Sequence, residues 1–386
     1  MTQSLSKPQL VATLLTSMTG MVIFNTMPLL IGEAQSHFGW GEQDLGLLAS
    51  SYLAAYALVA LISVFWLPRF SWKRLSAGAT VLAIVSCWLL SISTTKEHAF
   101  MAIALLGLAN GIVTPVSYAI VSNSSEADRV FGLKLAAELL SGSIFSGLLS
   151  IWILSTYGFT GIMALYACAY LIPSLCYRLI PRDYNQLGMN LQTEQKMPSL
   201  FKANALGWLA MFALFLEVAA MGGLWTFADV IGNTQGIEDS IRGSAFSFAM
   251  LSGLTGALCA VWLASKLGNI RPMIISHIFL VIATVLVFSS NQIIFFAGVC
   301  LLQGAWIFCN SYHFNWVAIS DHSGRLVGMI PGVMALGVGI GPLLLSTPLE
   351  NGRLILAGTI VVSIVLLTSV VIVIGARQHS RRSSYQ

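Results

Sequence analysis

The sequence predicts an all-α membrane protein with twelve transmembrane helices arranged as two six-helix bundles. Hydrophobic residues make up 56% of the 386 residues and charged residues only 9%, whereas a soluble domain carries roughly 25% charged residues. Twelve apolar runs reach the length of about 20 residues that a helix needs to cross a hydrocarbon core of roughly 30 Å. The basic residues between these runs also alternate in a regular way, and the two halves of the chain resemble each other.

The twelve predicted spans follow one another with short connections, and the ninth and tenth nearly touch at Asn291. They are expected at residues 10–31, 43–66, 74–93, 98–122, 130–153, 159–180, 205–227, 241–264, 273–290, 293–318, 326–346 and 353–375. The first span is expected to stay in the protein as a helix, because its flank has one lysine and no small-residue cleavage site follows.

The basic residues predict the orientation of the chain. If the N-terminus lies inside, sixteen of the nineteen Lys and Arg residues fall on one side, and only Lys96, Arg242 and Arg353 fall on the other. This asymmetry satisfies the positive-inside rule. We therefore expect a multi-pass protein of the plasma (inner) membrane with both termini cytoplasmic.

The longest polar stretch divides the chain into an N-terminal bundle at 1–181, a cytoplasmic linker at 182–204 and a C-terminal bundle with a basic tail at 205–386. The two bundles share sequence: NTMPLLIGEAQ at 25–35 aligns with WTFADVIGNTQ at 225–235, and RVFGL at 129–133 aligns with RLVGM at 325–329. Such repeats are typical of secondary transporters, which bind substrate near the midplane between the repeats.

Two loops carry a resemblance to a known family. WLPRFSWKR at 66–74 and WLASKLGNIR at 262–271 resemble the loop signature of the major facilitator superfamily, although Pro68 and Ser265 replace its acid. Together with the spans, the repeat and the charge pattern, the resemblance covers essentially the whole chain. It implies that helices 1, 4, 7 and 10 line a central cavity.

The resemblance has limits in two helices. GLANG at 107–111 has Gly107 where many drug–proton antiporters of the family carry an arginine, so their coupling scheme is not carried over. GVGIGP at 337–342 resembles a dinucleotide motif but lacks the preceding strand. Its glycines Gly337 and Gly341 predict close helix packing, with or without a bend.

The polar residues of the implied cavity helices are the candidates for substrate binding: Asn25, Asn110, Glu217, Trp225, Gln303 and Asn310. Trp225 and Trp306 would stack on an aromatic or cationic substrate. The alternative for Trp225 is anchoring at the membrane interface, because it falls near the outer end of its span.

Glu217 stands alone among apolar residues in FALFLEVAAM, about 18 Å along its helix and thus near the midplane. A carboxylate costs about 2.5 to 3.5 kcal/mol at the centre of a spanning helix, and desolvation there favours the protonated form. Glu217 is therefore predicted to couple protons or to contact substrate. The alternative is a hydrogen-bonded acid that holds helices together.

Glu138 is the second acid inside a span, and Lys134 lies one turn earlier on the same helix face. We expect an ion pair at the cavity mouth, with a structural or gating role favoured over proton coupling for Glu138. His313 is a candidate proton relay, but a tight helix contact is the commoner role for one buried histidine.

Basic and acidic loop residues are expected to form cytoplasmic contacts that stabilise one conformation of the transporter. The alternative is that these charges only fix the orientation of the helices in the membrane, which would give the same pattern. These gating candidates are Arg69, Lys73, Asp128, Arg129, Lys134, Lys266 and Arg271.

The function predicted is a proton-coupled secondary transporter for a small organic compound. Export is favoured because no Lys or Arg lies deep in helices 1, 4, 7 or 10. The alternatives are uptake of a small organic acid with protons, or a sensor that keeps the fold without transport.

No nucleotide-binding or hydrolase motif is present, so we expect no enzyme and no cofactor. All six cysteines fall inside spans, which predicts neither disulfides nor a metal site. Protons, lipid and the substrate are the expected partners of a monomer, with no nucleic acid.

Overall fold

The computed structural model describes residues 4–122, 124, 127–183, 186, 205–263, 268–320 and 325–383, and the regular structure there is helical. The N-terminal half contains α1 (Lys7–Asn25), α2 (Met27–Phe38), α3 (Glu42–Leu61), α4 (Ser63–Trp66), α5 (Trp72–Ser91), α6 (Lys96–Ser122), α7 (Ala127–Leu148), the π-helical turn η1 (Leu149–Ile153) and α8 (Leu154–Ser174). The C-terminal half contains α9 (Ala205–Thr234), α10 (Asp239–Leu263), α11 (Ile270–Val287), α12 (Gln292–Ser320), α13 (Arg325–Glu350) and α14 (Leu354–Ser383).

Three of the predicted spans, the first, the fifth and the sixth, differ from separate straight helices. The first consists of α1 and α2, which meet at an angle of 49°. Pro28 lies in the first turn of α2, where its missing N–H and fixed φ are tolerated but the ladder from α1 cannot continue. The chain from Val130 to Ser174 runs as 45 helical residues, enough for two crossings. Gly158 breaks it with φ 54°, a conformation that favours glycine.

By length and composition, ten described helical segments suffice to cross a membrane, and the bent pair of α1 and α2 adds an eleventh. The 45-residue segment counts once in that number and covers two of the predicted spans. The prediction of an all-α membrane protein is confirmed, and the expected twelve crossings fit the described helices.

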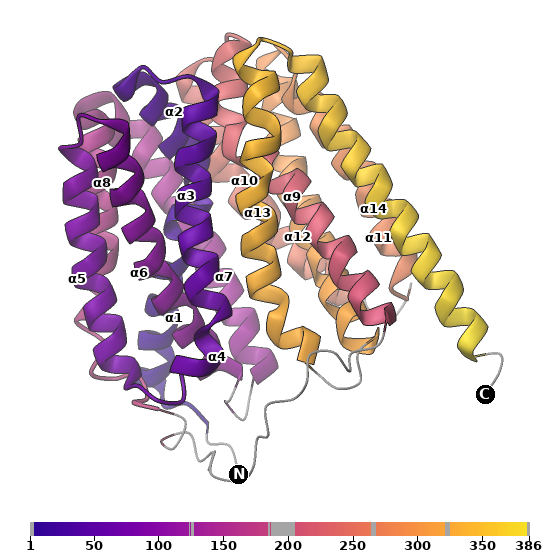
Figure 1. Ribbon diagram of the computed structural model, residues 1–386, viewed down its shortest axis with the longest axis horizontal. Coiled ribbons are helices and arrows are strands. Elements are labelled where there is room, and N and C mark those ends of the chain that lie inside the picture. The colour runs from indigo at the N-terminus through magenta and orange to yellow at the C-terminus, as the bar shows by residue number, and fades with distance from the viewer. Residues whose placement is uncertain are drawn as a thin grey trace.

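The helices stand side by side in two groups (Figure 1). Helices α1 to α8 lie on the indigo side of the molecule and α9 to α14 on the orange side, with both chain termini toward the lower end of the view. The groups meet where α3 packs against α13, α7 against α10, and α2 against α9. We call the end that carries α2 and the start of α3 the far end, because it lies opposite the termini.

Glycines allow α9 and α13 to pack closely within the C-terminal half. A Cβ atom on Gly223 of α9 would lie 2.6 Å from the carbonyl oxygen of Gly341 on α13, and one on Gly341 would lie 2.3 Å from the carbonyl oxygen of Ala219. Any side chain at these positions would push the two backbones apart. Close packing by Gly341 is therefore confirmed, and α13 runs as one helix from Arg325 to Glu350.

Candidate functional site

Two charged residues of α7 form a buried ion pair in the N-terminal half. Lys134 Nζ lies 2.6 Å from Glu138 Oε1, and the two side chains are 3% and 5% exposed. Ser17 of α1 donates a hydrogen bond to the same carboxylate oxygen, and Lys134 Nζ lies 3.7 Å from the ring centre of Tyr118 on α6. The expected ion pair is therefore present, and it faces α1 and α6, which correspond to two of the helices implied to line the cavity.

Three of the predicted substrate-binding residues form hydrogen bonds to other residues of the protein. Asn25 donates to a backbone carbonyl of α7 at 3.0 Å, and Trp225 donates from Nε1 to a backbone carbonyl of α1 at 3.2 Å. Asn110 donates to a backbone carbonyl of α1 at 2.7 Å and accepts a hydrogen bond from Tyr170 at 3.2 Å. These contacts hold α1 in place, and a substrate role for the three residues stays a prediction.

Three of the buried side chains of α12 that have unpaired polar atoms share one face of the helix. Gln303 Oε1, Trp306 Nε1 and Asn310 Oδ1 have no hydrogen-bond partner among the described residues, and the three residues are at most 5% exposed. Their spacing of three and then four residues places them on one helix face, which we call the α12 polar face. The Trp306 ring lies 6.1 Å from that of Phe24 on α1, so this face borders the N-terminal half.

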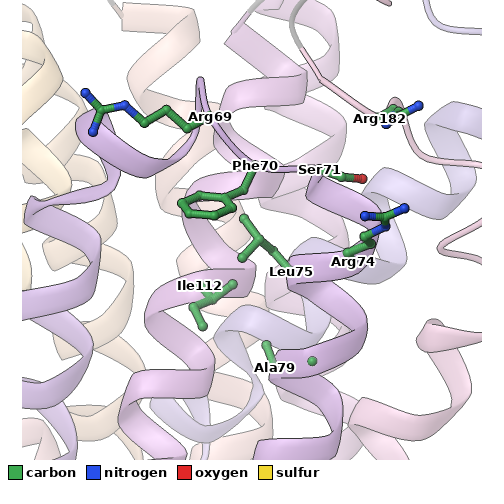
Figure 2. Close-up of a pocket in the computed structure, with 9 residues that line it drawn as sticks. Arg69, Phe70, Ser71, Arg74, Leu75, Ala79, Ile112 and Arg182 are labelled. Carbon is green, nitrogen blue, oxygen red and sulfur yellow. The ribbon is translucent and has the colours of Figure 1, made fainter.

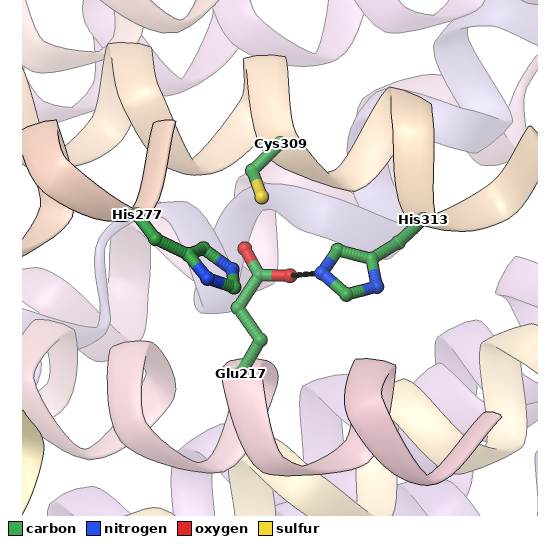
Figure 3. Close-up of side chains that lie close together, drawn as sticks. All are labelled: Glu217, His277, Cys309 and His313. Carbon is green, nitrogen blue, oxygen red and sulfur yellow. Dashed lines mark ion pairs between the residues drawn. The ribbon is translucent and has the colours of Figure 1, made fainter. Parts of the chain in front are cut away.

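Glu217 and three other side chains converge from three helices of the C-terminal half (Figure 3). Glu217 Oε2 is 2.7 Å from Nε2 of His313 on α12, and His277 of α11 and Cys309 of α12 complete the group. We call these residues the Glu217 cluster. Its members are at most 2% exposed. These partners all belong to the C-terminal half, so the geometry supports a role inside this bundle over direct contact with a substrate.

Sequence reasoning found Glu217 and His313 but missed His277 and Cys309. Glu217, His277 and Cys309 lie on three different helices, α9, α11 and α12. The sequence does not show which faces of these helices pack together. The available signal was a single histidine in the apolar stretch MIISHIFLVI of α11.

A buried ion pair near the far end was also missed. Asp229 Oδ1 lies 2.9 Å from Arg242 Nε, and Arg242 donates a further hydrogen bond of 2.6 Å to the carbonyl of Ile237. The span predicted at 205–227 stopped before Asp229, whereas α9 continues to Thr234. Asp229 therefore lies inside the helix and packs against Gly32 of α2, in the other half.

Of the loop residues predicted to gate the transporter, Arg69, Lys73 and Arg271 lie at the end that carries the termini. Arg69 is exposed and lines a shallow hollow with Arg74 and Arg182 (Figure 2). Lys73 donates a hydrogen bond of 2.7 Å to the carbonyl of Arg178. Arg271 is exposed at the start of α11. The side chains of Asp128, Arg129 and Lys266 lie outside the described part of the chain. Gating by these residues stays a prediction.

A family profile gives the family of the chain, and solved structures share its fold. A profile of the Major Facilitator Superfamily matches residues 10–346. The fold is similar to a crystal structure of a mutant of the nucleoside transporter NupG, with a TM-score of 0.78 and 16% identity over 96% of this chain and 100% of that chain. It is also similar to the POT family transporter PepTSo, with a TM-score of 0.73 and 10% identity over 97% of this chain and 98% of that one.

One curated relative comes from Oryza sativa subsp. japonica, where it is described as probable anion transporter 2, chloroplastic. It is 27% identical over 139 residues, which is 34% of this chain and 25% of that protein. The match thus spans about a quarter of the relative's length.

Proposed function

The chain belongs to the major facilitator superfamily, and from this premise we propose that it moves a small organic compound across the plasma membrane by proton-coupled alternating access. It is a multi-pass membrane transporter and not an enzyme. In the proposed cycle the N-terminal and C-terminal halves rock against each other around a substrate held between them.

The observation that carries proton coupling is the buried Lys134–Glu138 pair. Both charges lie out of water and compensate each other, and removing one charge of such a pair leaves the other buried and uncompensated. A proton that binds Glu138 would therefore destabilise the present arrangement of α7 against α1 and α6. The free energy of protonation would then drive a change of conformation, which is what coupling requires.

The α12 polar face is the part of the interface that we propose for substrate recognition. Gln303 and Asn310 offer unpaired carbonyl oxygens as acceptors, and Trp306 offers an N–H donor and a flat ring. A small substrate with hydrogen-bond donors for the two oxygens, an acceptor for the Trp306 N–H and a planar part would satisfy these atoms. Asn25, Asn110 and Trp225 would stand behind this face and shape the cavity from α1, α6 and α9.

For direction, we propose export in exchange for protons, because the residues that we propose to recognise substrate and to shape the cavity are amides and tryptophans. A second candidate is uptake of a small organic acid with a proton. Lys134 supports it, since this buried cation faces α1 and α6 and would be released for a substrate carboxylate when Glu138 is protonated. The partial match to an anion transporter agrees with this second candidate.

Flux in proteoliposomes loaded with a pH-sensitive dye would test the proposal. The purified protein is challenged with aromatic compounds, nucleosides, organic acids and lipophilic cations, and wild type is compared with Glu138→Gln and Glu217→Gln. Glu97→Gln is the control, because Glu97 is exposed at the start of α6. We expect a compound-dependent pH change that Glu138→Gln abolishes and Glu97→Gln retains.

The sign of the pH change separates exchange from co-transport, and a response to organic acids alone would favour the second candidate. A response that survives in Glu138→Gln with unchanged pH dependence would contradict coupling by this pair. If only Glu217→Gln abolished it, coupling would belong to the Glu217 cluster. Binding of a compound without flux would support a sensor that keeps the fold.

A further inference from the structure

The Glu217 cluster combines the side chains that bind transition metals. Two imidazoles, one thiol and one carboxylate come from α9, α11 and α12, and one ligand atom from each lies within 4.8 Å of the others. Figure 3 shows the Glu217 carboxylate between the two histidine rings, with the Cys309 sulfur directed toward it. Proteins seldom place four such groups together in an apolar bundle without a partner for them.

Several polar atoms of the cluster have no hydrogen-bond partner in the described part of the chain. They are both carboxylate oxygens of Glu217, both ring nitrogens of His313, and Nε2 of His277. Glu217 Oε2 and His313 Nε2 lie within ion-pair distance of each other, at 2.7 Å. A single cation at the centre would satisfy an oxygen and both imidazoles at once.

The orientation of His277 is set from outside the cluster. Its Nδ1 lies 2.7 Å from the hydroxyl oxygen of Ser369 on α14. That hydroxyl donates its own proton to the carbonyl of Val365 at 3.0 Å, so it accepts from Nδ1–H. The lone pair of His277 therefore resides on Nε2, the atom that belongs to the cluster. Histidines that bind metals are held in this way, with the other ring nitrogen donating to a fixed acceptor.

We propose that the Glu217 cluster binds one divalent transition-metal ion of the zinc class. Two nitrogens, one sulfur and one oxygen match the tetrahedral ligand sets of Zn²⁺, whereas Ca²⁺ and Mg²⁺ require mainly oxygen ligands. The charge also balances, because a thiolate and a carboxylate offset the two positive charges of the ion. Ligand bonds of about 2.0 to 2.3 Å in a tetrahedral site place the ligand atoms about 3.3 to 3.8 Å apart. The more distant atoms of the cluster, now up to 4.8 Å apart, would therefore draw together around the ion, and Glu217 Oε2 and His313 Nε2, now 2.7 Å apart, would separate.

A metal at this site would hold α9, α11 and α12 together inside the C-terminal half. The inference does not depend on the proposed function, because it concerns contacts within one bundle. Since the site is closed to solvent, the ion exchanges only when these helices transiently separate. Metal bound during folding therefore leaves slowly, and exchange with added Zn²⁺, Co²⁺ or a chelator requires long incubation.

The test uses the untagged, full-length protein, because a histidine tag would bind the same metals. Metal content is measured by mass spectrometry after purification and again after equilibration with Zn²⁺ and removal of excess ion. We expect one zinc per chain and a higher midpoint of thermal unfolding with zinc than after chelation. In the Co²⁺-substituted protein, a thiolate-to-cobalt charge-transfer band would report the Cys309 ligand directly.

Three variants make the test specific. Cys309→Ser should lose the charge-transfer band, and Ser369→Ala should keep the band while binding Zn²⁺ about 10- to 100-fold more weakly. Cys87→Ser is the control, because Cys87 is equally buried but lies in the N-terminal half, and it should bind as wild type does.

The proposal is overturned if wild type with intact helical circular dichroism holds no stoichiometric zinc. It is also overturned if Cys309→Ser and Ser369→Ala both bind zinc and cobalt as wild type does, since the metal would then lie elsewhere. Neither result depends on transport, so failure of the metal site is distinguishable from failure of the proposed function.

Discussion

Gly32 of α2 lies directly against the carboxylate of Asp229 on α9, across the boundary between the two halves. A Cβ atom on Gly32 would come within 1.9 Å of Asp229 Oδ2, and Arg242 fixes that carboxylate at 2.9 Å. Gly232, the counterpart of Gly32 in the second repeat, packs in turn against the side chain of Arg242, with a separation of 2.7 Å for an added Cβ. The two repeat glycines thus both pack against this buried pair, Gly32 from the N-terminal half and Gly232 from the C-terminal half.

The first prediction is that Gly32→Ala prevents normal closure of the far end. The added methyl group cannot fit unless Asp229 leaves Arg242, so we expect a loss of stability of about 1 to 3 kcal/mol, as for other overpacked sites, and reduced transport. Thermal unfolding in detergent and flux in proteoliposomes check this. Gly78→Ala is the matched control, because nothing lies within 4 Å of a Cβ there. Wild-type flux and stability in Gly32→Ala would show that the far end closes in another way.

Much of the fold follows from hydropathy alone, because each crossing must be apolar for about 20 residues. The sequence could not show where a crossing bends or how far a helix extends beyond the apolar core. The break between α1 and α2 depends on Pro28, and the extension of α9 to Thr234 depends on packing that shelters Asp229.

The candidate sites also differ in how far the sequence could predict them. The Lys134–Glu138 pair was predictable, since residues four apart on one helix always face each other. The Glu217 cluster was not, because His277 and Cys309 reach Glu217 only through the packing of three helices. Helix packing depends on the shapes of many side chains at once, and no local pattern in the sequence records it.

The second prediction concerns the energetics of the Lys134–Glu138 pair. Lys134→Met and Glu138→Leu each leave one buried charge unpaired, so each should lower the free energy of unfolding by about 3 to 5 kcal/mol. The double variant removes both charges and should be clearly more stable than either single variant. Unfolding in detergent, followed by circular dichroism, measures the cycle. Additive losses in the double variant would show that the two side chains do not act as a pair.

The third prediction separates substrate binding from stability on the α12 polar face. Gln303→Leu and Asn310→Leu remove buried carbonyl oxygens that have no partner in the described structure, so thermal stability should be unchanged or higher. If these oxygens bind substrate, each change should raise KM by about fivefold or more, since one hydrogen bond is worth about 1 kcal/mol.

Asn315→Leu is the control for this face, because the Asn315 amide pairs with Asn269 at 2.8 Å near the end that carries the termini. It should leave KM unchanged in the same flux assay. Unchanged KM in Gln303→Leu and Asn310→Leu as well would place substrate recognition on other residues.

The fourth prediction tests movement between the halves through α7 and α10. Ser143 and Ser247 face each other across this contact, with their hydroxyl oxygens 3.2 Å apart, and Ser247 also donates to the carbonyl of Ser143 at 2.9 Å. Cysteines at both positions should form a disulfide on mild oxidation, because side chains this close satisfy the short reach of the bond. Since rocking requires α7 and α10 to shift against each other, oxidation should abolish flux and a reductant should restore it.

The variants Ser143→Cys and Ser247→Cys alone control for the native cysteines and should transport equally under both conditions. Full transport by the cross-linked protein, with the disulfide verified by mass spectrometry, would mean that this contact stays fixed and that the halves open elsewhere.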